Sequence, residues 1–279
     1  LADLDPAARR LLEVVAVAGG PLAQALALAL SPGATLAHVD ALCVSGMLVS
    51  GESEASPAIE VAHDRIRDLT LFGVEPESCR ATHWAIGEQL LAHVGDAPLG
   101  DDIFAIADHF EAGLASVEGM SPTKRLELAE LQRQAGERAL AAAAWTSARR
   151  YFALGHQLVE PWLAEARRGE GPRALCLAIS SGRVQAEAMF KSNQADLAFA
   201  ELLSWSLSSA ELGQIVAQRV ASLRCTGRMP EAIAIGHTGL ARLGWSLPRH
   251  PSMLRALLTI LLGWRTLGRL DVEVIRDVV

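Results

Sequence analysis

The residues most able to bind a ligand are a histidine and an aspartate at a predicted junction between a strand and a helix. His63 and Asp64 follow a segment of alternating polarity and precede a helical pattern. An imidazole at that position can donate a hydrogen bond to a phosphate oxygen. In the structural alternative, Asp64 caps the helix and His63 ends the strand, partly buried and hydrogen-bonded. The neighbouring Arg65, Arg67 and Asp68 would then form exposed ion pairs of small value.

Other titratable residues carry weaker signals for catalysis or metal binding. His83 and His93 are ten positions apart on one predicted helix, which does not place them on one face for a metal. Asp101 and Asp102 are adjacent carboxylates, but their place before a predicted helix favours capping. The sequence has no phosphate-binding loop or zinc-protease motif, and Ser180-Ser181-Gly182 lacks the flanking glycines of a nucleophile elbow. We therefore expect no catalysis, and no metal or cofactor, from this chain alone.

The elements expected to position His63 and Asp64 are three short helices and a β-hairpin. Asp5-Pro6 is a strong helix start, and Gly19-Gly20 is a strong stop. After the third helix the apolar period changes from about 3.6 to 2, which predicts strands. The predicted elements are helices at 7–18, 21–30 and 35–45, and strands at 47–49 and 58–62 around a turn at 51–57.

Beyond Asp64 the chain is predicted to be helical. A polar stretch at 161–171 is interpreted as a connector and as the main internal boundary. The predicted helices lie at 64–72, 77–93, 103–114, 122–144 and 145–158.

A repeat of helix pairs is predicted in the last third. Residues 193–198 align on 227–232 with an offset of 34, the period of tetratricopeptide helix pairs. The small residues Ala198 and Ala232 would allow close approach of two helices. Ala148, with Gly136 twelve positions before it, indicates an earlier degenerate unit. The apolar segment 253–267 lacks the polar cap of a solenoid end, so we expect the chain to be a piece of a longer protein.

Composition and charge limit the classes of partner. The chain has 279 residues and a net charge of −7, and residues 1–95, with 12 acidic residues and 5 arginines, account for that excess. If the N-terminal part bound DNA, the predicted helix at 35–45 would be its recognition helix. This helix has no lysine or arginine to contact phosphates, so we expect no nucleic acid as partner. The four cysteines are widely spaced, as in the reduced core of a cytoplasmic protein. No apolar run reaches the roughly 18 residues of a membrane span.

Four sequence blocks together resemble a known class of bacterial regulator. Their order and spacing are similar to the region that follows the ATPase core in STAND-type (NACHT-like) ATPases of multidomain serine/threonine kinase signalling proteins. The blocks are His63–Ile66 with Pro76, Arg80, His83, Ile86-Gly87 and Leu90-Leu91; Ile103–Phe110; Lys124-Arg125 with Leu128-Ala129, Ala135-Gly136, Ala139, Ala148 and Tyr151; and Leu243–Pro248.

The resemblance implies a mainly α fold, a winged helix with one small β-hairpin followed by a tetratricopeptide-like α-solenoid. Residues 1–95 would be the winged helix, 96–160 a helical bridge with a degenerate repeat, and 161–279 the repeats. In that family the histidine of a His-Asp pair contacts the β-phosphate of ADP. His63 and Asp64 match that pair, while Leu69-Thr70-Leu71 departs from the usual Ala-Ala-Tyr.

The expected function is that of a non-catalytic regulatory and protein-interaction segment. Its partners would be the nucleotide-binding and kinase domains of its own protein, which would hold any ADP or ATP, and another protein on the repeat surface. The alternatives are a plain helical-repeat scaffold, in which His63 is structural, and a winged-helix transcription regulator.

Overall fold

The computed structural model describes residues 4–52, 57–95, 99–100, 102–190, 193–245 and 257. These residues are mainly helical with one small antiparallel sheet, which confirms the predicted class at that level. Contacts divide the chain into two units, residues 1–206 and 207–279. The boundaries proposed from the sequence after residues 95 and 160 both fall inside the first unit.

The first helix, α1 (Pro6–Ala18), organises the N-terminal part. The Asp5 carboxylate accepts hydrogen bonds from the backbone N–H groups of Ala7 and Ala8 at 3.0 and 3.4 Å, and Gly19 ends the helix with a φ of 75°. Helix α1 packs against α3 (Leu36–Val44), α4 (Asp64–Phe72) and β3 (Pro57–Val61). The resulting core holds Leu11, Leu12, Val14, Val15, Leu22, Val39, Leu42, Leu48, Ile59 and Ile86.

The sheet confirms the predicted hairpin and adds a strand that sequence reasoning missed. Strand β2 (Leu48–Glu52) pairs with β3, and β3 also pairs with β1 (Leu22–Ala23), giving the order β1-β3-β2. The helix predicted at 21–30 is therefore wrong at its start, and α2 spans only Gln24–Ala29. Pairing with the buried Ile59 buries Leu22 and satisfies the outer edge of β3.

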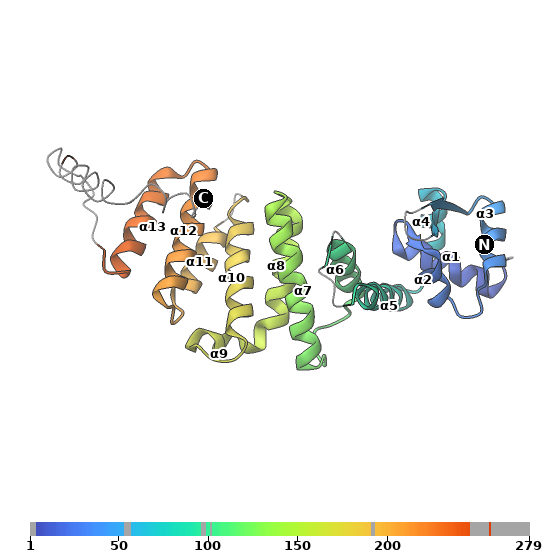
Figure 1. Cartoon of the computed structure of the whole chain (residues 1–279), viewed down its shortest axis with the longest axis horizontal. Helices are drawn as coiled ribbons and strands as arrows, with labels where there is room; N and C mark the ends of the chain where they lie inside the picture. The colour runs from blue at the N-terminus through green and yellow to red at the C-terminus, as the bar shows by residue number, and fades with distance from the viewer. Residues whose placement is uncertain are drawn as a thin grey trace, which may run out of the picture. The chain divides into compact units, whose positions relative to one another are not determined.

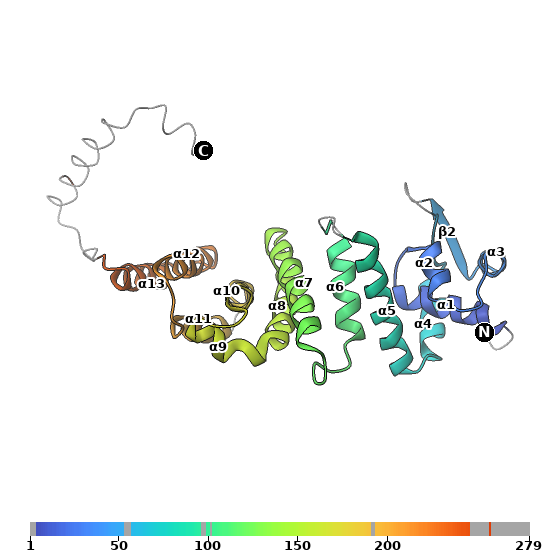
Figure 2. The ribbon, with the colours of Figure 1, turned by 60° about the horizontal axis from the view of Figure 1, so that its bottom comes forward.

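Helices α4 to α8 follow the predicted order with small differences at their ends. Prolines stand at the first helical position of α5 (Pro76–Val94) and α7 (Pro122–Ala141), where a missing N–H costs nothing. Helices α5 and α6 (Asp102–Gly113) lie side by side (Figure 2). A Cβ at Gly113 would sit 2.6 Å from the backbone nitrogen of Trp84, so this glycine permits their close contact.

The segment 161–171, predicted as a polar connector, links α8 to the next long helix but is partly helical. A 3-10 turn at Glu160–Trp162 leads into α9 (Leu163–Arg168). Leu163 and Ala166 are buried, and these two apolar side chains, three residues apart, suffice to hold a short helix on its neighbours.

Helices α7, α8 (Trp145–Val159) and α10 (Arg173–Glu187) lie next to one another (Figure 1). One aromatic ring lies between them. The Phe152 side chain, fully buried, meets Gly136 of α7 and Gly182 of α10. A Cβ added at these glycines would lie 2.7 and 2.2 Å from ring carbons of Phe152. Gly136 and Ala148, which the sequence indicates as an earlier degenerate unit, are both buried in the packing of α7 and α8.

Two helix pairs occur where the sequence repeat predicts them. In the first unit α10 is followed by α11 (Gln194–Leu203), and in the second unit α12 (Ser209–Cys225) is followed by α13 (Met229–Arg242). Ala198 and Ala232 are buried at equivalent places in the two pairs. Within the second unit, Val216 of α12 fills the space above Gly239 of α13.

Several sequence-based expectations are corrected or lie outside the described residues. Cys225 is exposed, so it is not a core thiol, whereas Cys176 is buried. Leu36, an apolar residue of the helix predicted at 35–45, has 57% of its surface exposed. Among the helices that the structure describes, none is both long and apolar enough to cross a bilayer. The tip of the hairpin turn at 53–56 and the apolar segment 253–267, apart from Leu257, lie outside the described residues.

The packing of Phe152 predicts a strong effect of Gly182→Ala. The new methyl group would overlap the ring, so we expect a loss of about 1–3 kcal/mol in the free energy of unfolding, measured by urea denaturation. Gly155→Ala is the control, because a Cβ there meets its nearest atom at 3.4 Å, an ordinary contact. Equal effects of the two substitutions would contradict this account of the packing.

Candidate functional site

The structure places His63 and Asp64 at the entrance to α4, one residue beyond the end of the sheet. His63 is extended, with φ −152° and ψ 141°, and occupies the capping position, while Asp64 is the first helical residue. Asp64 was predicted to cap this helix, and that prediction is wrong, because the capping position belongs to His63. His63 makes no capping hydrogen bond through its side chain, and both side chains are exposed. The alternative of a partly buried, hydrogen-bonded His63 is contradicted.

Arg67 has a structural role that the sequence did not reveal. Its Nε donates to the carbonyl oxygen of Ala16 at 3.0 Å, near the C-terminal end of α1. Among the described residues Arg67 has no ion-pair partner, contrary to expectation, because its side chain turns inward over Gly19. A Cβ at Gly19 would be 2.7 Å from the guanidinium, so the glycine both ends α1 and admits Arg67.

A cavity of about 100 Å³ lies beside this junction. It is lined by Val15, Gly19, Gly20, Glu60, Val61, Asp64 and Arg67. Two carboxylates flank one guanidinium, so the cavity itself does not favour an anion. A phosphate would have to approach His63 from its exposed side, at the N-terminal end of α4.

Two exposed apolar side chains follow on the same helix. Leu69 and Phe72 have 57% and 93% of their surface exposed, and a spacing of three places them on one side of α4. A phenylalanine this exposed in a small surface group is a feature of contact surfaces. The junction thus combines a polar pair at the helix start with an apolar pair two turns later.

His83 forms a pair with a histidine that the sequence did not connect with it. Its Nδ1 lies 2.9 Å from Nδ1 of His109, across the contact of α5 with α6. Burial, helped by His83, lowers the pKa of His109 to about 4, although Asp108 opposes the change. Burial and the charge of Arg67 lower the pKa of His83. Both rings are therefore neutral at pH 7, and one donates to the other.

The remaining carboxylate and metal hypotheses find no further support. Asp102 begins α6, and Asp101 lies outside the described residues. Within the described ranges no group of three or more His, Cys, Asp or Glu side chains is arranged to hold a metal ion.

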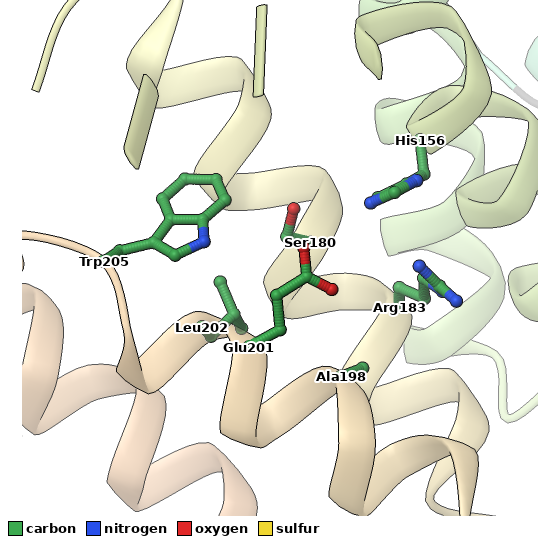
Figure 3. A pocket seen from close by; sticks show the side chains of 7 residues that line it. All are labelled: His156, Ser180, Arg183, Ala198, Glu201, Leu202 and Trp205. Carbon is green, nitrogen blue, oxygen red and sulfur yellow. The ribbon is translucent and has the colours of Figure 1, made fainter. Parts of the chain in front are cut away.

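A polar notch between α8, α10 and α11 also escaped sequence reasoning (Figure 3). Two buried groups in it, Ser180 Oγ and Trp205 Nε1, have no hydrogen-bond partner in the protein. Leaving such a group unpaired costs about 1–3 kcal/mol. The one available signal was Trp205, a large residue at the repeat position that Gly239 occupies in the next pair. The notch is lined by His156, Ser180, Arg183, Ala198, Glu201, Leu202 and Trp205.

Comparisons with known protein families, with curated proteins and with solved structures find no match for this chain. Its function is therefore argued from its own residues.

The histidine pair predicts a pH dependence of stability. Because the pKa of His109 falls from 6.5 to about 4 on folding, the unfolded chain binds more protons between these values. The free energy of unfolding should therefore be highest above pH 6.5. It should fall by on the order of 1–3 kcal/mol as the pH is lowered towards 4. The free energy of unfolding, measured by urea denaturation, should therefore differ less between pH 7 and pH 5 for His109→Gln than for the unmodified chain.

The exposed His93 supplies the control for this experiment. His93→Gln should keep the full pH dependence, because this exposed side chain lies outside the contact of His83 with His109. An undiminished pH dependence in His109→Gln would contradict the assignment.

Proposed function

We propose that this chain is a non-catalytic regulatory and protein-interaction segment of a multidomain STAND-type signalling ATPase. Residues 1–95 would be a winged helix that docks on a nucleotide-binding domain. The helix pairs from α7 to α13 would be tetratricopeptide-like repeats that hold a partner protein. The order of elements supports this assignment, since three helices and a hairpin precede a series of antiparallel helix pairs.

One observation carries the regulatory part of the proposal. His63 stands exposed at the N-terminus of α4 with no side-chain partner among the described residues. A histidine that stabilises its own fold would be packed or hydrogen-bonded, and this one is neither. Its side chain is available to a phosphate oxygen held by another domain, and the first N–H groups of α4 would add to the attraction.

The docking surface would be completed by the exposed side of α4. Leu69 and Phe72 could be buried against the nucleotide-binding domain in the ADP state and released after exchange. A coupling of about 1–3 kcal/mol between nucleotide and docking is enough to shift the equilibrium by roughly 5- to 150-fold. Burial of one phenylalanine side chain is worth about that much.

A plain scaffold is the second candidate. Met229 and Ile233 are exposed at a spacing of four on α13, which gives the second unit an apolar face of its own. A scaffold would bind its partner through such faces whatever nucleotide is present. Capture of a partner that depends on α13 and is insensitive to ADP or ATP would favour this function over the regulatory one.

The regulatory proposal predicts that His63 retains ADP. In the protein that contains the nucleotide-binding domain, His63→Ala should speed the release of a fluorescent ADP analogue by about 5- to 150-fold. The substitution removes an exposed side chain, so the stability of the chain should change by less than about 0.5 kcal/mol. His93→Ala, at another exposed histidine, is the matched control. Unchanged ADP release in His63→Ala would sink the sensor role.

The apolar side of α4 gives a second, independent prediction. Phe72→Ser should leave the melting temperature of this chain almost unchanged, because the ring is 93% exposed. In the protein with its nucleotide-binding domain the same substitution should accelerate ADP release, since the docked state loses buried apolar area. Ile233→Ser, a similar change at a side chain 56% exposed, should have no effect on release. Equal release rates for the two variants would argue against docking through α4.

A further inference from the structure

The notch between α8, α10 and α11 has the groups of a small anion site. Figure 3 shows the indole nitrogen of Trp205 and the side chains of Ser180 and Glu201 converging on one space, with His156 and Arg183 on its other side. The free space is about 10 Å³, room for one water-sized group. Only the end of a side chain or of a main chain could enter it.

The two unpartnered groups require an acceptor. Trp205 is 4% exposed and Ser180 is 7% exposed, and neither Nε1 of the indole nor the Oγ has a protein partner. An indole N–H can only donate, and a hydroxyl can donate by rotating. Both can be satisfied together by a single oxygen atom placed between them.

The charges around the notch favour a negative oxygen. The Glu201 carboxylate is already paired with Arg167 of α9. Arg183, which also lines the notch, makes no ion pair or hydrogen bond within 3.5–4.0 Å among the residues that the structure describes, so its guanidinium remains available to a ligand. Burial, helped by Arg183, lowers the pKa of His156, so this ring is neutral at pH 7 and offers one further N–H.

The segment that carries Trp205 is held in place from two sides. The backbone N–H of Ser206 donates to the carbonyl oxygen of Arg167 at 3.0 Å, and Arg173 Nη2 donates to the carbonyl oxygen of Ser206 at 2.8 Å. The indole is therefore fixed before a ligand arrives, so little ordering remains to oppose binding.

The geometry points to a binding site for a carboxylate group of a partner protein, held by Trp205, Ser180 and Arg183. One carboxylate oxygen would accept from the indole N–H and the hydroxyl, and the guanidinium would neutralise the charge. Only one oxygen of the ligand would occupy the space, which suits the narrow end of a carboxylate better than a tetrahedral phosphate, and a neutral carbonyl would gain no charge interaction with Arg183. The inference needs the helix pairs but not the nucleotide sensor, so it can fail or hold independently of His63.

Acetate is the simplest probe, and the indole of Trp205 is the reporter. In the 15N-labelled full chain, the Trp205 indole resonance is assigned by comparison with Trp205→Phe. Acetate is then titrated against chloride at constant ionic strength, with acetamide as the neutral isostere. We expect a saturable shift of this resonance with acetate and none with acetamide. A shift that does not saturate, or equal shifts with both probes, would overturn the site.

Two substitutions with opposite expected effects on acetate affinity make the test more specific. Arg183→Gln should weaken acetate binding by about tenfold or more, because it removes the compensating charge. Glu201→Gln should strengthen acetate binding, because it removes a nearby negative charge and frees Arg167. Arg168→Gln is the matched control, since this arginine pairs with the exposed Glu170 at 3.6 Å and does not line the notch. If Arg183→Gln fails to fold, weaker or unchanged binding in Glu201→Gln still refutes the proposal.

The source of the carboxylate is distinguished with two peptides. N-acetyl-alanyl-alanine presents a chain-terminal carboxylate, and N-acetyl-aspartyl amide presents a side-chain carboxylate. Saturable binding of the first supports recognition of a partner's C-terminus, and binding of the second supports recognition of an acidic side chain. Binding of acetate with neither peptide would overturn the assignment to a protein partner.

Discussion

The contact of the Phe152 ring with two glycines determines how the central helices of the first unit are spaced. Gly136 on α7 and Gly182 on α10 leave room for the ring, and a methyl group at either position would overlap it. The consequence reaches the polar notch, since His156 lies one turn beyond Phe152 on α8, and Ser180 and Arg183 flank Gly182 on α10. Side chains with no mutual hydrogen bonds are thereby held together by apolar packing beneath them.

The two candidate surfaces, the polar notch and the start of α4, differ in rigidity and in exposure. The notch is fixed, small and buried, and two of its donors, Ser180 Oγ and Trp205 Nε1, have no acceptor within the described part of the chain. The start of α4 is open, with an exposed imidazole and an exposed phenylalanine that cost little in the isolated chain. A fixed site suits recognition of one chemical group, whereas an open helix face suits reversible docking. A regulatory segment that joins a nucleotide state to a partner protein needs both.

Local signals in the sequence predicted most helices because they act over a few residues. Pro6, Pro76 and Pro122 begin helices where expected, and the small residues Ala198 and Ala232 mark the paired helices. Strand β1 is only two residues long and exists because β3 has a free edge, which no local pattern encodes. The segment 161–171 is rich in charged residues. Its two buried apolar residues, Leu163 and Ala166, form too short a periodic pattern to predict α9.

The candidate site shows the same division between local and long-range information. The sequence located His63 and Asp64 at a strand-to-helix junction, but it could not decide whether His63 was buried. The pairing of His83 with His109 depends on how α5 and α6 pack, and the notch depends on three helices and the segment after α11. The two histidines are 26 positions apart, and the notch gathers residues from His156 to Trp205, so spacing along the chain gives little indication of either site.

The central claim is that α4 docks on a nucleotide-binding domain in a manner that depends on the nucleotide. Hydrogen exchange of the backbone amides of Asp64–Phe72 tests it directly, because those near the exposed helix start are poorly protected until a second surface covers them. In the protein that contains that domain, the account predicts slower exchange across α4 with ADP bound than with a non-hydrolysable ATP analogue. Equal exchange in the two nucleotide states would contradict it.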